Sequence, residues 1–565
     1  TIVSVRRLDA DFDMSSLLTG KVVVRSVVLD EPIARISQSV DDGSVNVARI
    51  NPPTLRPTKG PKVVPRIIVR SGVIELGEHV TDPARLGAGE PAYTSLKRID
   101  VAGEVQQSPD ESGAKIISFR QYADPQGIHP VPGGLTVSGR VAPDGITITL
   151  EGLALGTWSP ESAPARSREL FRQTALEGEV SRAVMVYSYT GGWEARIALA
   201  DVAMNLPIKA RPDETIDGDE VPLTPEQANR LLRIQRVNGE VIFSDTGVRG
   251  RLKGLVEELP YEVNFRVDGT SKDSAFTCHF VSRGFKLEQK PEIVYFAPGV
   301  ARRRLEQFGD PTGIVDAEVT IFRGPPVDGK EADVQVDGKL WFREVTAAFA
   351  KFPYRFHNMT GEVTFDDKRI VLKHIEGDSP SGARVVCTGT IAPPTSTAAV
   401  DLDIRVTNLP MDAELAQAMR QRKRVIEALF SAERYQALLA AGLIATPGQH
   451  DGAVAGVAAM EAAGRTDGPE YEAIQALAAR PVFELGGRAE VHVAIQRRYS
   501  VESHWTDTVT IRLARAGVLP ERVPYPMIVE NLTIIKEDAL ATVQGGVYRG
   551  LRGGEAVITA RADFD

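Results

Sequence analysis

The segment Gly324 to Lys330 has the residue types that come closest to a site for chemistry. It fits the first seven places of a P-loop, in which backbone N–H groups cradle phosphate and a lysine contacts it. The eighth place holds Glu331, where magnesium binding needs serine or threonine. Pro325 and Pro326 also remove N–H donors from the loop. We therefore interpret this segment as a turn and not as a nucleotide site.

Histidines, cysteines and acidic residues are too scattered along the chain to predict a metal or nucleophile site. None of the eight histidines forms an H-x-H or H-E-x-x-H pair, and His279, which follows Cys278, has no further ligand at zinc-site spacing. No G-x-S-x-G elbow occurs, and the acidic pairs Asp366–Asp367 and Glu537–Asp538 fall in expected turns. We expect a protein that is not an enzyme and that uses neither a metal nor a cofactor.

The size and charge of the chain exclude some classes of protein. At 565 residues it exceeds the size at which single cores stop growing, so we expect several domains or an elongated array. The net charge of -9 argues against nucleic acid as a partner, because phosphate binding needs a basic face. Cys278 and Cys387 are too few for a disulfide scaffold, and we expect Cys387, in a strand-like run, to be a buried inert thiol.

No run of the sequence reaches the ~18 apolar residues that a transmembrane helix needs, and no signal peptide is apparent. The chain starts at Thr1 in a strand-like segment and ends at Asp565 shortly after another. We expect it to be a segment of a longer protein, so that any membrane anchor would lie outside it.

Short runs that alternate apolar and polar residues are the dominant pattern, and they would have to position any functional group. Examples are Ile146–Leu150, Leu402–Val406 and Val491–Ile495. This period of two predicts strands that bury one face and expose the other. Glycine and proline punctuate these runs as expected for turns. The fold class is therefore predicted to be mainly β.

Helical periodicity occurs in a few places only. We expect helices at Ala165–Gln173, at Leu223–Ile234 and, most strongly, at Asp412–Ala441, with Asp412 as the N-cap. A further Ala-rich helix is expected over Ala453–Ala479, with an interruption near residues 464–469.

Several short motifs repeat along the chain, as in proteins built from repeated units. The tripeptide Gly-Glu-Val begins at Gly103, Gly178, Gly239 and Gly361. An apolar-Pro-Tyr motif begins at Leu259, Phe352 and Val523, and Asn-Leu-Pro occurs at Asn205 and Asn408. Reused turn chemistry would explain single motifs, but their matching order favours repeated β units.

The opening stretch, Leu8 to Ile50, carries the most specific family signal. A Leu-Leu-Thr-Gly step precedes a strand, then Leu29-Asp30-Glu31-Pro32, then a strand that ends in Asp-Gly-Ser-Val-Asn. This order resembles the N-terminal strands of the AsmA-like family of bacterial envelope proteins. The unit at Phe352 to Ile391 and the step Leu409-Pro410-Met411-Asp412 are similar to later parts of large members. Together these similarities cover about half the chain.

The resemblance implies an elongated, twisted, U-shaped antiparallel β-groove with a few short inserted helices, related to TamB and chorein-type bridge-like lipid transfer proteins. Members are tethered to the inner membrane, project into the periplasm and are implicated in moving phospholipids between membranes. The implied partners are phospholipids, bacterial membranes (through parts absent from this segment) and envelope proteins, without nucleic acid. We expect five segments along the chain. The first three are an N-terminal β-groove segment (1–158), a β segment with short helices (159–236) and repeated β-groove units (237–410). A helical insertion (411–480) that covers an opening of the groove and a further unit cut short at its C-terminus (481–565) follow.

The apolar positions of the alternating runs are the candidate functional residues, because they would line the wall of such a groove and contact acyl chains. These residues are Ile74, Leu76, Ile146, Ile148, Leu150, Val241, Phe243, Val363, Phe365, Leu402, Ile404, Val406, Val491, Val493 and Ile495.

Two other classes of protein share the strand periodicity. A structural array of β-sandwiches, serving as a spacer, an adhesin or an outer-membrane assembly factor, would close its apolar faces against each other. A glycan-acting β-solenoid enzyme would need a cluster of carboxylates on one face, and the long predicted helices fit it poorly.

Overall fold

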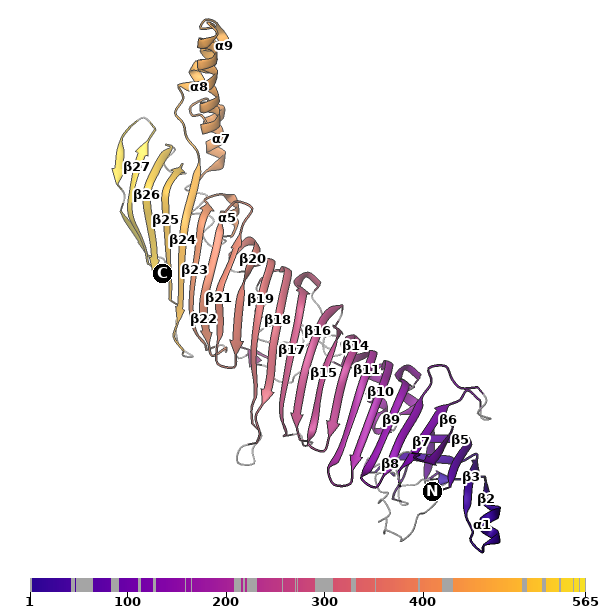
Figure 1. The fold of residues 1–565 in the computed structure, drawn as a ribbon. Coiled ribbons are helices and arrows are strands. Elements are labelled where there is room, and N and C mark those ends of the chain that lie inside the picture. Colours follow the sequence, from indigo (N-terminus) through magenta and orange to yellow (C-terminus); the bar gives the residue numbers. More distant parts are fainter. Residues whose placement is uncertain are drawn as a thin grey trace. The chain divides into compact units, whose positions relative to one another are not determined.

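Strands make up most of the computed structural model, in agreement with the predicted fold class (Figure 1). The structure describes residues 3–41, 46, 65–82, 91–109, 113–124, 129–157, 159–163, 165–207, 215–216, 219–220, 231–256, 258–269, 271, 273–289, 308–326, 332–350, 352–394, 397–418, 430–499, 506–520, 525–537, 540–551, 553–557 and 559–563. Of the P-loop-like segment, the structure describes only Gly324, Pro325 and Pro326. Residues 327–331 lie outside the described residues, so the predicted turn stays a prediction.

The first half of the chain contributes the strands β1 (Val3–Ser4), β2 (Arg7–Phe12), β3 (Val24–Asp30), β4 (Ile33–Ser39), β5 (Arg66–His79), β6 (Tyr93–Gln107), β7 (Lys115–Gln121), β8 (Thr136–Ala142), β9 (Gly145–Ala154), β10 (Glu177–Ser188), β11 (Gly192–Pro207), β12 (Thr215–Ile216), β13 (Asp219–Glu220), β14 (Leu231–Ser244), β15 (Gly247–Val256), β16 (Leu259–Asp268) and β17 (Ala275–Lys286). The second half contributes β18 (Thr312–Arg323), β19 (Val334–Phe349), β20 (Phe352–Asp366), β21 (Ile370–Asp378), β22 (Arg384–Ala392), β23 (Ala399–Pro410), β24 (Gly486–Arg497), β25 (Thr506–Val518), β26 (Met527–Glu537), β27 (Leu540–Gly550), β28 (Glu555–Val557) and β29 (Ala560–Asp563). The α-helices are α1 (Met14–Leu18), α2 (Ala165–Thr174), α5 (Ala413–Ala418), α7 (Ala432–Ala440), α8 (Pro447–Ala462) and α9 (Pro469–Ala478), and three short 3-10 turns are η3 (Leu155–Thr157), η4 (Pro160–Ser162) and η5 (Leu287–Gln289).

Twenty-seven of the strands that the structure describes belong to one continuous sheet that does not close into a barrel, while β12 and β13 form a separate pair. Neighbours in sequence pair as antiparallel hairpins along most of the sheet, as predicted. The expectation of a purely antiparallel sheet is wrong at β5, which pairs in parallel with β3 and with β4. The cause is topological: β4 lies between β3 and β5 in sequence, and residues 40–65 connect β4 to β5. Connections of this length allow parallel pairing where a tight turn does not.

The chain forms two units. Unit 1 comprises Thr1–Ala210, Leu223–Ser282 and Thr320–Val334, and unit 2 comprises Arg211–Pro222, Arg283–Val319 and Gln335–Asp565. The five sequence segments expected above stay predictions, because they concern repeated units within the sheet and not this division.

β-Bulges bend many of the strands, and they explain the repeated motifs. Gly239 and Gly361 of the Gly-Glu-Val motif have φ of 143° and 146°. Asn358 and Asn408 adopt φ of 50° and 59°, a left-handed conformation that asparagine tolerates better than most residues. The strand registers shift at these places, for example between His357/Thr360 and between Val406/Leu409. A bulge bends its strand and increases the local twist, so the motifs encode the curvature of the sheet.

The fully buried residues gather near the bulges and not along the whole of each strand. Val202, Val237 and Leu409 follow bulge positions directly and are buried. Tyr354 of the second apolar-Pro-Tyr motif is also buried, with its hydroxyl 2.7 Å from the Ser381 hydroxyl. The core is thus a set of local clusters at the strand bends, and the remaining lengths of strand are only partly covered.

The helical predictions were confirmed in part. Helix α2 occupies the expected place, and α8 and α9 form the Ala-rich pair with the expected interruption. The start of α8 was missed: Thr446 and Gln449 form a capping box in which each side chain accepts the other residue's backbone N–H. Asp412 caps α5 by accepting the N–H of Leu415 at 3.0 Å, as predicted.

Two helical predictions were wrong where the structure describes them. The continuous helix over Asp412–Ala441 is instead α5 and α7, because Phe430 forms a bridge with Leu519 and Ser431 is the N-cap of α7. A helix was expected at Leu223–Ile234, but its last residues, from Leu231 on, belong to strand β14. Within this strand Leu232 pairs with Leu206 of β11. Residues 221–230 and 419–429 lie outside the described residues.

A partly exposed apolar sheet face as the candidate functional site

Unit 1 has two rows of apolar residues that run across neighbouring strands on one face of the sheet. Opposite residues of paired strands point to the same face, so the strand registers define these rows. Row A is Ala10, Val27, Ile67, Val105, Ile117, Gly139, Ile148, Met185, Ala195, Phe243, Val248, Val267 and Phe276. Row B is Leu8, Leu29, Val69, Gly103, Phe119, Val137, Leu150, Ala183, Ile197, Val241, Gly250, Phe265 and Cys278. Neither row contains a charged residue.

The opposite face of the same strands is mostly polar. The intervening row is Ile68, Glu104, Ser118, Ser138, Thr149, Val184, Arg196, Ile242, Arg249, Arg266 and Thr277. Its charged members form ion pairs, such as Arg196 with Glu194 at 2.8 Å and Arg266 with Asp268 at 2.6 Å. This face is therefore suited to water, and rows A and B define what we call the apolar face of unit 1.

The described protein covers the apolar face of unit 1 only in part. No residue of rows A and B is fully buried, and Met185 is 41% exposed. With strands about 4.8 Å apart and same-face residues about 6.7 Å apart, two such rows cover on the order of 800 Å². Large uncharged apolar strips that are not fully buried are candidates for binding an apolar partner. Rows A and B are such a strip.

Unit 2 has an equivalent apolar face. Row C is Leu340, Val363, Leu372, Gly389, Leu402, Ile495 and Asp507. Row D is Ile375, Cys387, Ile404, Val493, Val509, Lys536 and Ala541. Row E is Gly377, Val385, Val406, Val491, Ile511, Ile534 and Val543. These rows are apolar from β19 to β24, and charges enter two of them at β25 and β26.

Asp507 and Lys536 form an ion pair on the apolar face of unit 2. Their side chains approach to 2.7 Å, and the Lys536 side chain is largely buried. A buried cation without a partner would be costly, and the Asp507 carboxylate offsets that cost. Rows C and D are therefore interrupted near the last strands.

Helix α5 covers part of the apolar face of unit 2. Leu415 and Ala418 of this helix pack in one cluster with Val385 and Val406 of row E. This contact explains why Val385 and Val406 are buried whereas the residues of rows A and B are not. The expected covering role of the helical insertion stays a prediction for the groove as a whole. Helix α7 packs elsewhere, on Ile444, Phe483 and Leu519.

The structure places the predicted wall residues on these apolar faces. In unit 1, Ile148, Phe243, Leu150 and Val241 are members of rows A and B. Ile74, like Leu150, packs against the buried cluster of Ile99, Val101 and Leu135. Ile146 opposes Val141 and Tyr187, and Leu76 lies two positions after Ile74 on β5. In unit 2, rows C, D and E contain Val363, Leu402, Ile495, Ile404, Val493, Val406 and Val491, and Phe365 opposes Ile370.

Sequence reasoning missed other members of the rows. Examples are Ile117, Val137 and Phe265. The alternation of their strands is as clear as that of β9 or β24, which carry predicted residues. The same period-two signal could have identified them. The ion pair of Asp507 with Lys536 had no such signal, because two charged residues 29 positions apart meet only through the pairing of β25 with β26.

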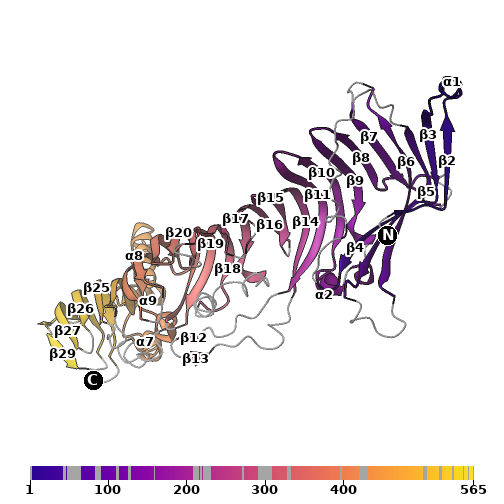
Figure 2. The same ribbon diagram turned by 90° about the horizontal axis from the view of Figure 1, so that it is seen from below.

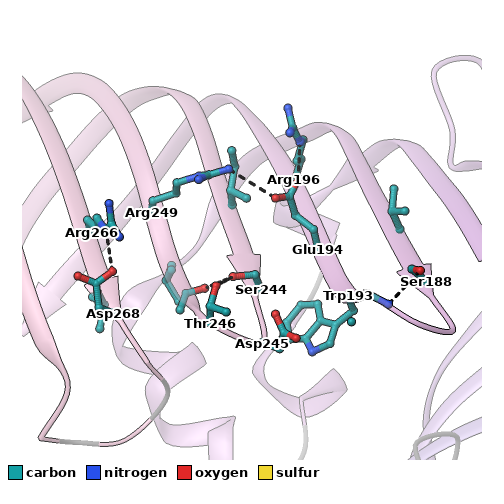
Figure 3. Close-up of a pocket in the computed structure, with 17 residues that line it drawn as sticks. Ser188, Trp193, Glu194, Arg196, Ser244, Asp245, Thr246, Arg249, Arg266 and Asp268 are labelled. Atoms are coloured by element: carbon teal, nitrogen blue, oxygen red, sulfur yellow. Dashed lines mark hydrogen bonds and ion pairs between the residues drawn. The ribbon is translucent and has the colours of Figure 1, made fainter.

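A hollow on unit 1 provides an alternative candidate site (Figure 3). It lies where polar-face side chains of β11, β14, β15 and β16 meet the turns, and Trp193, Glu194 and Arg249 contribute to its lining. Glu194 pairs with both Arg196 and Arg249, and Arg266 pairs with Asp268. Because these charges already neutralise one another, the hollow is a weaker candidate than the apolar face.

The two cysteines of the apolar faces do not have the properties of catalytic nucleophiles. Burial raises the pKa of the Cys387 thiol in row D to about 11, and it also raises the pKa of Cys278 in row B. A thiol whose pKa is raised is a poor nucleophile at neutral pH. On the polar face, a hydrogen bond with His492 lowers the pKa of Asp403, and the two side chains approach to 2.6 Å.

No group of three or more histidine, cysteine, aspartate and glutamate side chains is placed to hold a metal ion within the described residues. Among the helices that the structure describes, none has the length and apolar character needed to cross a membrane. Comparison with known proteins gives no match to a family model, to a curated protein or to a solved structure.

Proposed function

We propose that the chain is a non-enzymatic, bridge-like lipid transfer protein whose apolar faces carry phospholipid acyl chains between two membranes. The observation that carries the proposal is the pair of rows A and B, which are apolar across thirteen paired strands and are not fully buried at any position. A surface of this size needs an apolar partner, and acyl chains fit because they require apolar contact without a specific pocket.

The energetics favour acyl chains that bind and then move along the face. Burying a methylene contributes roughly 0.8 kcal/mol, so a chain in contact over several methylenes is held firmly. Rows A and B consist of aliphatic, aromatic and small residues without charges, so neighbouring positions hold a methylene about equally well. Equal sites in series allow the chain to move from one to the next, as conduction requires.

The family resemblance of the N-terminal strands supports the same proposal and adds a location. If the chain is an AsmA-like protein, the sheet is a U-shaped groove in the periplasm that carries phospholipids between the inner and outer membranes. The repeated bulges support a curved sheet, because each bulge bends its strand. Envelope proteins would then be further partners.

A β-sandwich array agrees less well with the observations. It would require separate sheets that close on each other, whereas the described strands, apart from the β12–β13 pair, belong to a single sheet. It would also bury the apolar positions, whereas rows A and B stay partly exposed.

The experiment replaces one apolar-face residue and its neighbour on the other face. Ile148→Asp puts a charge in row A, and Thr149→Asp puts the same charge on the polar face one residue later. Losing contact with about two methylenes corresponds to about tenfold in affinity. We expect Ile148→Asp to reduce phospholipid transfer between vesicles, and phospholipid that co-purifies, by at least about tenfold, while Thr149→Asp behaves like the wild type.

Circular dichroism of both variants checks that the sheet is intact. Equal transfer by Ile148→Asp and wild type would refute a role for the apolar face, and so would an equal loss in both variants.

A further inference from the structure

The most exposed apolar side chains of unit 1 lie at the end of the β2–β3 hairpin. Leu18 is 89% exposed, and Met14 and Val22 are each 70% exposed. Leu17 and Phe12, at the same end of the hairpin, are each 40% exposed. Figures 1 and 2 both show α1 at the far end of β2 and β3, away from the other labelled elements of unit 1. We call these five residues the apolar tip.

Hydrogen bonds fix the shape of the tip and keep its apolar side chains directed outward. The Asp13 carboxylate accepts the backbone N–H of Ser15 at 3.2 Å and lies 2.6 Å from the Arg25 guanidinium. The Asp13 N–H donates to the Val23 carbonyl at 2.8 Å, which closes the base of the loop. Leu18 is therefore exposed in a structured turn.

Rows A and B begin on β2, next to this tip. Their first members, Ala10 and Leu8, lie on β2, and Leu8 is 60% exposed. Among the described residues, β2 pairs with β3 alone, so it is an edge of the sheet. A lipid at the tip would thus reach both rows without crossing a polar surface.

We propose that the apolar tip inserts into the surface of a phospholipid bilayer and holds edge strand β2 against it, so that rows A and B open directly into the membrane. The inference rests on the proposed function for its purpose, because a lipid conduit needs an end that receives lipid. It adds a membrane contact made by residues of this chain itself.

The size of the tip favours a bilayer over a protein partner. Five side chains around one helical turn are far fewer than the roughly 20–30 residues that each partner gives to a stable protein interface. A short projecting turn of leucine, methionine, phenylalanine and valine can instead enter the boundary between headgroups and acyl chains. Lys21, in the same loop, has a long stem that lets its ammonium reach the headgroups.

The charge of the tip predicts which bilayers it binds. Arg25 is paired with Asp13, which leaves Lys21 as the one remaining charge within residues 12–25. Binding should therefore depend on apolar insertion and only slightly on anionic lipid or salt.

The test is flotation of the 565-residue chain with vesicles of phosphatidylcholine alone, at low and at high salt. The tip variant is Leu17→Ser with Leu18→Ser. The matched control is Leu443→Ser with Val454→Ser, which removes two exposed apolar side chains near and within α8. We expect the wild type and the control to float at both salt concentrations, and the tip variant to lose at least about tenfold in bound fraction.

Several outcomes would overturn the inference: a wild type that does not float, a tip variant that floats like the wild type, and flotation that appears only with added phosphatidylglycerol and vanishes in salt. A dimer that dissociates in the tip variant, seen by light scattering without vesicles, would also overturn it, because the tip would then bind a second copy. Phospholipid that co-purifies is measured in parallel. A wild type that carries lipid and does not float refutes the membrane contact alone, and one that floats without carrying lipid refutes the proposed function alone.

Discussion

Single residues on the apolar face differ from their neighbours chiefly in which side of the sheet they occupy. Ile148 and Thr149 are adjacent, yet one belongs to row A and the other to the polar row. The alternation of side chains along a strand makes this assignment predictable from sequence. What could not be predicted is which apolar residues are covered: Val406 and Ile404 alternate alike, but α5 packs on Val406 and buries it.

Cys387 offers a test at the residue scale, because it is a native thiol within row D. With a pKa of about 11, its reactive thiolate is on the order of a thousandth of the total at pH 8, and alkylation should accelerate about tenfold per pH unit up to that value. Bound acyl chains would slow the reaction further. In a Cys278→Ala background, we expect slow alkylation at pH 8 that becomes faster after lipid is extracted.

Peptide mass spectrometry measures the extent of alkylation at Cys387. Rapid labelling at pH 8 that does not change when lipid is removed would contradict both the buried thiol and the position of the lipid.

At the scale of elements, the repeated motifs were visible in sequence, but their structural meaning was not. Gly-Glu-Val combines a glycine at a bend with a glutamate on the polar face and a valine on the apolar face, as in Glu362, which pairs with Lys373, and Val363 in row C. The continuous helix predicted at Asp412–Ala441 was wrong for a different reason. Its apolar stripe is a local pattern, whereas the bridge of Phe430 with Leu519 is a long-range contact that no local pattern reveals.

Gly361 tests the role of the bulges. Its φ of 146° disfavours a side chain, and an added Cβ would lie 2.6 Å from the His374 carbonyl oxygen. We expect Gly361→Ala to lower the free energy of unfolding by about 1–3 kcal/mol, as measured by urea denaturation. The control is Gly324→Ala, where an added Cβ would meet nothing within 4 Å and stability should change little. Equal stability of the two variants would contradict the structural role of the bulge.

At the scale of the whole molecule, the mainly β class could be predicted, because it follows from alternation that recurs along the sequence. A single continuous sheet was expected from the family resemblance alone, since an array of β-sandwiches has the same alternation. The parallel pairing of β5 and the division into two units could not be predicted, since each depends on which distant segments meet. The identity of the partner is likewise a matter of the whole surface. Each apolar position alone is unremarkable, and only the registers show that those of unit 1 form uninterrupted rows.

The most direct test of the central claim is native mass spectrometry of the wild-type chain, purified from cells without added detergent. Rows A and B predict that the chain retains several phospholipid molecules, of mixed headgroups, because the contacts are with acyl chains. Extraction and lipid analysis identify these molecules. A freshly purified, folded chain whose mass equals that of the polypeptide alone would contradict the account.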